Sequence, residues 1–268
     1  MKAIAITSDE KFERLLDHIG WQAHRAKDYW YLVTKLQAAT DDYQAEMNET
    51  PAFWGFTFYA FRDVVLSCLC RLYDQDPRVL SLGRFLKTIQ TYRGYFSDEH
   101  FRERLHLQSL ATDRTRVDDN ALQDEIRSVS STDPLVSRLV KLRNGLIAHN
   151  DDELVLGNVQ RPGGLEPKEV QTLLDRAVQI ASKYSLIYRA SWASTKVVGA
   201  DDYEQLLSLL REGHASVTAR IEEEIRQAQA IRHDGRLVVL FRSLGRISGR
   251  IKSTLRRRAA RRRVPAST

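Results

Sequence analysis

The amino-acid sequence predicts an all-α fold, a helical bundle with long helices followed by a basic amphipathic tail. Its composition favours helices, because 268 residues include only 6 prolines and 13 glycines, and 28% are charged. Apolar residues recur at helical spacing through most of the chain. A start signal for helices, a capping side chain directly before a proline, occurs at Thr50-Pro51 and Asp133-Pro134, and Glu166-Pro167 opens a further helix.

The N-terminal half predicts helices over residues 12–37, 52–75 and 81–92, and a polar region, 97–131, with one or two surface helices. Ser8 can cap the first helix, with Asp9 and Glu10 near its positive end. The helix that follows Pro51 is apolar nearly all round, so we expect it to be buried in the bundle. The core is also expected to hold the tryptophans Trp21, Trp30 and Trp54.

The C-terminal half predicts, in order, a helix over residues 135–149, a short strand at 153–159, and helices over 168–192 and 203–229. Gly199 separates the last two helices. We expect residues 1–199 to form the bundle, 200–235 an additional helix packed on it, and 236–268 a partly disordered tail.

Charge is divided unevenly between these regions. Residues 236–268 carry 11 basic and no acidic residues, whereas the rest of the chain carries 30 basic and 35 acidic residues. A basic tail on an acidic body favours an anionic partner, either nucleic acid or a membrane surface.

Several function classes lack their signatures in this chain. It has no P-loop, no Rossmann glycine pattern, no nucleophile elbow and no HExxH zinc motif. The two cysteines, Cys68 and Cys70, are too few for a disulfide framework and too closely spaced for a zinc knuckle. No metal and no cofactor are expected. Reduced cysteines and an N-terminus without a long apolar core predict a cytoplasmic protein.

One arginine lies where an apolar side chain is expected. On a helical wheel with Leu135 at 0°, the apolar stripe of residues 135–149 covers Arg143, at about 80°. Asn144 points away, at about 180°, and His149 lies about 120° from Arg143. Arg143 and His149 therefore converge only if the helix ends at His149 or if two copies of it meet, and Gly145 favours the second arrangement by permitting close backbone approach.

The sequence leaves a structural explanation open for each of these side chains. A buried guanidinium needs an acidic partner, and Asp63 and Asp74 on the preceding apolar helix are the candidates. Arg71 is expected to have a buried partner as well, and its pairing with Asp74 is interpreted first as structural. His149 can bond the free carbonyls of a helix end.

The run from Leu142 to Asp151, LRNGLIAHND, resembles the signature of HEPN domains, which is an arginine, a polar residue and then a histidine after a gap of four to six residues, here five. The chain is most similar to the abortive-infection U-type HEPN proteins, which share an aromatic helix ending in Leu-Tyr-Asp, here Leu72 to Asp74. The resemblance covers about residues 8–210 and leaves the tail outside.

The resemblance implies a metal-independent endoribonuclease that acts as a homodimer, a toxin or abortive-infection effector in anti-phage defence. His149 would act as general acid or base, Arg143 would clamp the phosphate and stabilise its transition-state charge, and Asn144 would orient these groups. Possible supporting residues are Asp151, Asn150, Asp74 and Arg71. Asn150 also suits a helix C-cap. The alternative is a non-catalytic HEPN module that binds RNA or a nucleotide.

The implied partners are RNA, a second copy of the chain and an antitoxin protein. The tail predicts an amphipathic helix that presents arginines every four residues. It fits nucleic acid, an anionic membrane surface or an acidic antitoxin, and we favour nucleic acid because it agrees with the implied substrate. Its expected phosphate-binding residues are Arg242, Arg246, Arg250, Arg256, Arg257 and Arg258.

Overall fold

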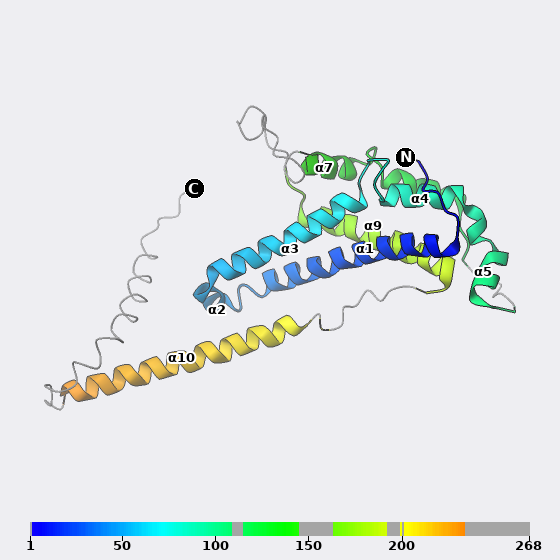
Figure 1. Ribbon diagram of the computed structural model, residues 1–268. Coiled ribbons are helices and arrows are strands. Elements are labelled where there is room, and N and C mark those ends of the chain that lie inside the picture. The colour runs from blue at the N-terminus through cyan, green and yellow to red at the C-terminus, as the bar shows by residue number, and fades with distance from the viewer. Residues whose placement is uncertain (1, 109–114, 145–162, 192–198, 200, 234–268) are drawn as a thin grey trace. The chain divides into compact units, whose positions relative to one another are not determined.

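A computed structural model describes residues 2–108, 115–144, 163–191, 199 and 201–233 (Figure 1). These residues contain helices and no strand, which confirms the all-α fold. The strand predicted at 153–159 lies outside the described residues.

The described helices are α1 (Asp9–Ala38), α2 (Gln44–Glu49), α3 (Pro51–Leu72), α4 (Leu82–Thr91), the 3-10 helix η1 (Arg93–Phe96), α5 (Asp98–Leu105), α6 (Asp119–Ser128), α7 (Pro134–Leu142), α9 (Pro167–Arg189) and α10 (Asp202–His233). The sequence did not indicate α2. In the described part of the polar region 97–131 lie two helices, α5 and α6, each with one buried side chain, Phe101 and Leu122 respectively, and Leu122 belongs to the main core.

The predicted caps hold at some helices and fail at others. The Ser8 hydroxyl accepts a hydrogen bond from the Lys11 N–H, and the Asp133 carboxylate accepts from two N–H groups at the start of α7. The side chain of Thr50 makes no capping bond. At Thr50 the reason is geometric, because α2 ends directly before it and its backbone is not extended as a cap requires.

The core lies where α1, α3 and α9 pack together (Figure 1). Near the start of α1, Phe12 is fully buried, and its ring centroid lies 4.8 Å from that of Tyr188 on α9. Tyr73, just after α3, is also buried, and its hydroxyl donates to the Leu173 carbonyl oxygen at 2.7 Å. These contacts join helices far apart in the sequence into one bundle.

Only the second half of α3 is buried as expected. Its buried side chains there are Val65, Cys68, Leu69, Cys70 and Leu72. In the first half, Phe53, Phe56 and Tyr59 are exposed by 60%, 77% and 71%. The expectation of burial all round is therefore wrong for this half, because neighbouring helices cover only one of its faces. Trp21 on α1 is likewise exposed, whereas Trp30 and Trp54 are buried.

By length and composition alone, α3 is the one described helix that passes as a candidate membrane span. This is weak evidence, since the core helix of a soluble protein passes the same test.

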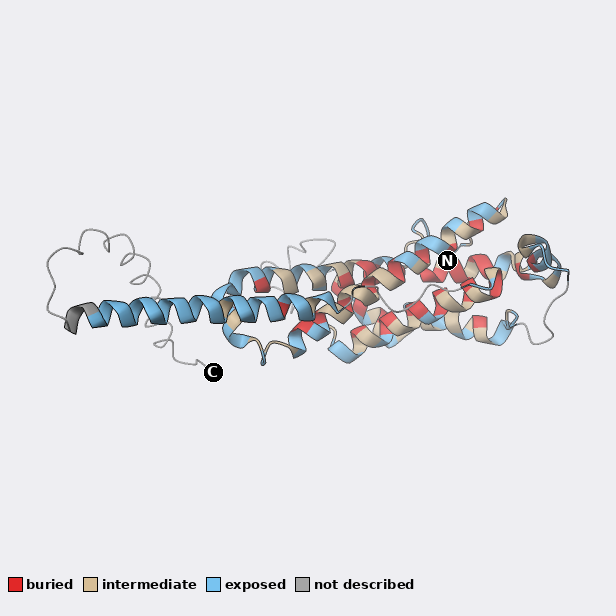
Figure 2. Cartoon of the chain, turned by 90° about the horizontal axis from the view of Figure 1, so that it is seen from below, coloured by how far each residue is buried: buried red, intermediate tan, exposed pale blue. Residues whose placement is uncertain are grey.

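The chain divides into two units, residues 1–207 and 208–268. In the first unit, Leu207 from the second turn of α10 is buried in a small cluster with Leu36, Met47 and Trp54. In the second unit, α10 is exposed along its described side chains up to residue 230, apart from the half-buried His214 (Figure 2). That residues 200–235 pack on the bundle as one additional helix stays a prediction.

Candidate active site at the end of α7

The end of α7 places Arg143 beside the core. Asp133 caps this helix through the N–H groups of Leu135 and Val136, at 2.9 and 3.0 Å. The buried residues Val136, Leu139 and Leu142 then fix one face of α7 against the bundle. Arg143 follows Leu142 directly and keeps helical backbone angles, so its position is set by this packing. The α-helix runs to Leu142 and continues as π-helix through Asn144, and the rest of the predicted helix, residues 145–149, lies outside the described residues.

Arg143 forms an ion pair with Asp74. Its Nη1 donates to Asp74 Oδ1 at 2.9 Å, and the side chains are 30% and 6% exposed, respectively. The same Asp74 oxygen also accepts the Asp76 N–H at 2.9 Å. A carboxylate buried this far needs such partners, because desolvation without them costs several kcal/mol, roughly. Of the two acids proposed from the sequence, Asp74 is therefore the partner, and Asp63 is exposed.

The ion pair leaves part of the guanidinium open. Asp74 engages only Nη1 of Arg143, and within the described ranges no other hydrogen bond of this side chain is formed. Arginine has five N–H donors in a planar fork, so several donors remain for an anion. Arg143 is thus held through one nitrogen, and its side chain is 30% exposed.

Arg71 does not have the buried partner expected from the sequence. It is exposed and forms no ion pair with Asp74 among the described residues. The helix ends at Leu72, and Asp74 lies beyond the Tyr73 cap, so residues 71 and 74 no longer share a helical face. Asp74 turns inward to Arg143, while Arg71 stays at the surface.

The positive charges of Arg143 and Arg71 both affect the pKa of the buried Cys70 thiol. Burial raises the pKa of Cys70 to about 11, and the positive charges of Arg143 and Arg71 partly oppose that rise. Asp76 lies on the other side of the turn, where hydrogen bonds from Arg78 lower its pKa to about 2, with Arg143 contributing. Two guanidinium groups therefore influence the thiol at the end of α3, and of these Arg143 is paired with a buried acid.

One positioning residue of this site was not found from the sequence. The Gln75 side-chain amide donates to the carbonyl oxygens of Tyr73 and Val129, and its oxygen accepts the Ser131 N–H. Gln75 thereby holds the turn that carries Asp74 against the segment that leads into α7. A glutamine in a polar turn gives no sequence signal of this role.

The other predicted site residues are placed only in part. Asn144 is exposed, in agreement with its position on the helical wheel. His149, Asn150 and Asp151 lie outside the described residues, as do the tail residues Arg242, Arg246, Arg250, Arg256, Arg257 and Arg258. Of the predicted site residues, the described chain therefore brings Arg143 and Asp74 together in an ion pair, and the role of His149 stays a prediction. Among the described residues, no group of three His, Cys, Asp or Glu could hold a metal ion.

A family model described as AbiU2, of the HEPN_AbiU2 family, matches residues 9–207. No curated protein and no solved structure matches the chain significantly. The matched residues include all of the bundle from α1 to the second turn of α10, and with them Asp74, Arg143 and His149. The chain therefore belongs to the HEPN_AbiU2 family and is an abortive-infection HEPN-domain protein of the U type.

Proposed function

We propose that this protein is a metal-independent endoribonuclease that acts as a toxin or abortive-infection effector in anti-phage defence. The observation that carries the proposal is the setting of Arg143. Its guanidinium is fixed by the buried Asp74 and remains 30% exposed with donors to spare. An arginine that served only the core has no need of that exposure, whereas an arginine that binds a phosphate requires it.

The proposed reaction uses a nucleophile that the RNA itself carries. The 2′-oxygen attacks the adjacent phosphorus, the bond from phosphorus to the 5′-oxygen breaks, and a 2′,3′-cyclic phosphate and a 5′-hydroxyl result. His149 takes the proton from the 2′-hydroxyl or gives one to the departing 5′-oxygen. Arg143 donates to the phosphate oxygens on which charge grows in the transition state. Asn144, exposed beside Arg143, orients one of these groups.

A homodimer would place the phosphate-binding arginine and the proton-transferring histidine at the same phosphate. On one continued helix, Arg143 and His149 point about 120° apart, so a single helix does not direct both at one phosphate. Two copies that meet at residues 143–149 would bring the arginine of one to the histidine of the other. The same arrangement provides two histidines, one for each proton transfer.

The pairing of Arg143 with Asp74 also favours a second candidate, a non-catalytic module that binds RNA or a nucleotide. In that case the ion pair is structural, and the basic tail localises the protein to nucleic acid or a membrane. The two candidates differ in which change removes function.

A growth assay in the host separates them. We expect Arg143→Ala and His149→Ala each to abolish toxicity while the protein still folds and dimerises, with the surface substitution His100→Ala as a matched control. Removal of residues 236–268 should weaken toxicity less. Full toxicity of His149→Ala, together with loss on removal of the tail, would contradict the ribonuclease and support the binding module.

A further inference from the structure

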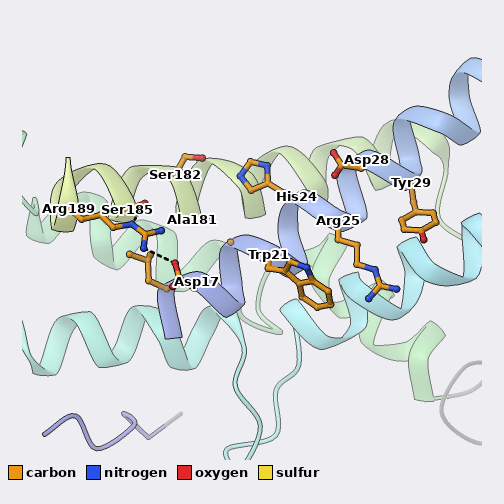
Figure 3. Close-up of a pocket in the computed structure, with 12 residues that line it drawn as sticks. Asp17, Trp21, His24, Arg25, Asp28, Tyr29, Ala181, Ser182, Ser185 and Arg189 are labelled. Atoms are coloured by element: carbon orange, nitrogen blue, oxygen red, sulfur yellow. Dashed lines mark hydrogen bonds and ion pairs between the residues drawn. The ribbon is translucent and has the colours of Figure 1, made fainter. Parts of the chain in front are cut away.

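A groove of about 450 Å³ lies along α1 and α9, outside the site at the end of α7 (Figure 3). Its wall on α1 carries Trp21, Arg25 and Tyr29, and α9 contributes Ser182 and Ser185 among others. No lining residue comes from α7 or from the turn that holds Asp74. The groove is therefore a separate feature of the bundle.

One side of the groove is an alternation of aromatic rings and a cation. Trp21, Arg25 and Tyr29 are four residues apart, so they share a face of α1. The Arg25 guanidinium lies 5.0 Å from the Trp21 ring centroid and 5.8 Å from that of Tyr29. Trp21 is 54% exposed, and within the described residues no carboxylate forms an ion pair with Arg25. Flat faces and an available guanidinium are what unpaired bases and their phosphates contact.

The other side of the groove offers polar edges. In Figure 3, His24 points toward α9, on the side where Ser182 lies, whereas Trp21 and Arg25 point away from α9. Burial lowers the pKa of His24 and raises the pKa of Asp28, so both side chains are partly desolvated. Together with the serine hydroxyl they present donors and acceptors to the edge of a planar ligand.

Gly20 keeps the groove open. It lies in the interior of α1, where glycine costs about 1 kcal/mol relative to alanine. A Cβ placed on it meets nothing within 4 Å, so no packing contact requires a glycine here. Gly20 lines the groove, and a larger side chain there would take up part of its space.

We propose that this groove binds an unpaired base of single-stranded RNA, stacked on Trp21 with a flanking phosphate at Arg25. The proposal rests on the proposed function in that it takes RNA as the substrate. The opposite charges of Arg25 and Asp28 favour an uncharged base at the centre over a bare phosphate. The groove would then anchor the substrate strand away from the bond that is cut.

The test measures base-dependent binding with the full-length His149→Ala chain, in which the RNA is not consumed. The probes are a labelled oligoadenylate of about six nucleotides and an abasic oligonucleotide of the same length and charge. Phosphate contacts of the basic tail bind both probes equally, so the ratio of the two affinities reports on base contacts alone. We expect the oligoadenylate to bind about tenfold more tightly, as stacking of one base predicts.

Trp21→Leu and Gly20→Leu should each abolish that preference. Two matched controls should retain it. Tyr59→Leu removes another exposed ring, and Gly213→Leu fills another helical glycine that has open space around it. Gly20→Leu should melt at or above the parent temperature, because leucine favours the helix, and this separates a filled groove from a misfolded chain.

An unchanged preference in Trp21→Leu and Gly20→Leu, or no preference in the parent, would overturn the proposal. The outcome is independent of cleavage. If the chain that retains His149 cuts RNA and no base preference is found, the groove proposal fails and the ribonuclease stands. If the preference is found and depends on Trp21 but RNA is not cut, the groove proposal stands and the ribonuclease fails.

Discussion

Along α3, residues 51–61 carry no charged side chain and residues 62–72 carry three, yet the second half is the buried one. In the first half Phe56 is 77% exposed, whereas Leu69 in the second half is fully buried. The second half ends at the turn that carries Asp74, where Asp74 pairs with Arg143 at the end of α7 and Tyr73 bonds Leu173 of α9. The first half is covered on one side, by α1, α2 and the small cluster around Trp54.

The comparison shows that burial of an apolar helix depends on which neighbours reach it, not on its own composition. An apolar periodicity tells which face can be buried, but a helix that is apolar all round gives no such direction. For α3, the buried half is the one that carries the site, because the packing that holds Leu69 also fixes the start of the turn to Asp74.

The largest expected effect separates the two halves by stability. Leu69→Ala removes a fully buried side chain and should lower the free energy of unfolding by about 2–5 kcal/mol. Phe56→Ala removes a larger side chain from an exposed position and should cost far less. Denaturant unfolding of both variants measures this difference. Equal losses in the free energy of unfolding would contradict the claim that only the second half of α3 is buried.

The next effect concerns Asp74. Asp74→Asn removes the charge that holds Arg143 and should cost about 1–3 kcal/mol, since a partly buried cation loses its partner. RNA cleavage should fall at least about tenfold at substrate saturation, because Arg143 is no longer held in place. The control is Asp63→Asn, an exposed acid on α3, which should change neither quantity. Normal cleavage by Asp74→Asn would remove Asp74 from the site.

A pH effect is expected from Cys70, whose pKa burial raises to about 11. Below the ordinary thiol pKa of about 9 both folded and unfolded chains keep the proton, so this contribution to stability is fully present. As the pH rises from about 9 to about 11, the unfolded chain ionises first and stability falls. Unfolding at several pH values, parent against Cys70→Ala, isolates the effect. An identical pH profile for the two proteins would show that the thiol is not desolvated.

The smallest effect is expected on the exposed half. Phe56→Ser should change the free energy of unfolding by less than about 0.5 kcal/mol, because the ring is mostly in water already. Thermal unfolding at low protein concentration measures the chain alone. A loss of several degrees would mean that this half of α3 is covered in solution.

Much of the fold could be predicted from local signals. Ser8 and Asp133 have short polar side chains that bond nearby N–H groups, so their helix starts depend on neighbouring residues only. The wheel position of Arg143 also indicated a buried acid, because a guanidinium on an apolar stripe needs one. Asp63 and Asp74 are both candidates from the sequence. Asp74 is the partner because the chain after Tyr73 brings it to Arg143, a tertiary contact that the sequence does not reveal.

What could not be predicted depends on distant contacts. The exposure of Trp21 and Phe56 is set by which helices pack beside α1 and α3, and no local pattern encodes that. The position of Arg71 among apolar residues on the helical wheel predicts a buried partner, but Arg71 is exposed. The helix ends at Leu72, so Arg71 and Asp74 do not share a helical face. Gln75 donates to the carbonyl oxygen of Val129, 54 residues away, and the sequence around Gln75 gives no indication of this contact.

The central claim is that this chain cuts RNA without a metal and that His149 takes part in the chemistry. The most direct test incubates purified protein with RNA in excess EDTA, beside its His149→Ala and His100→Ala variants, and analyses the new ends. The account predicts cleavage by the parent and by His100→Ala, with 2′,3′-cyclic phosphate and 5′-hydroxyl ends, and none by His149→Ala. Cleavage that EDTA abolishes, or that His149→Ala retains in full, would contradict it.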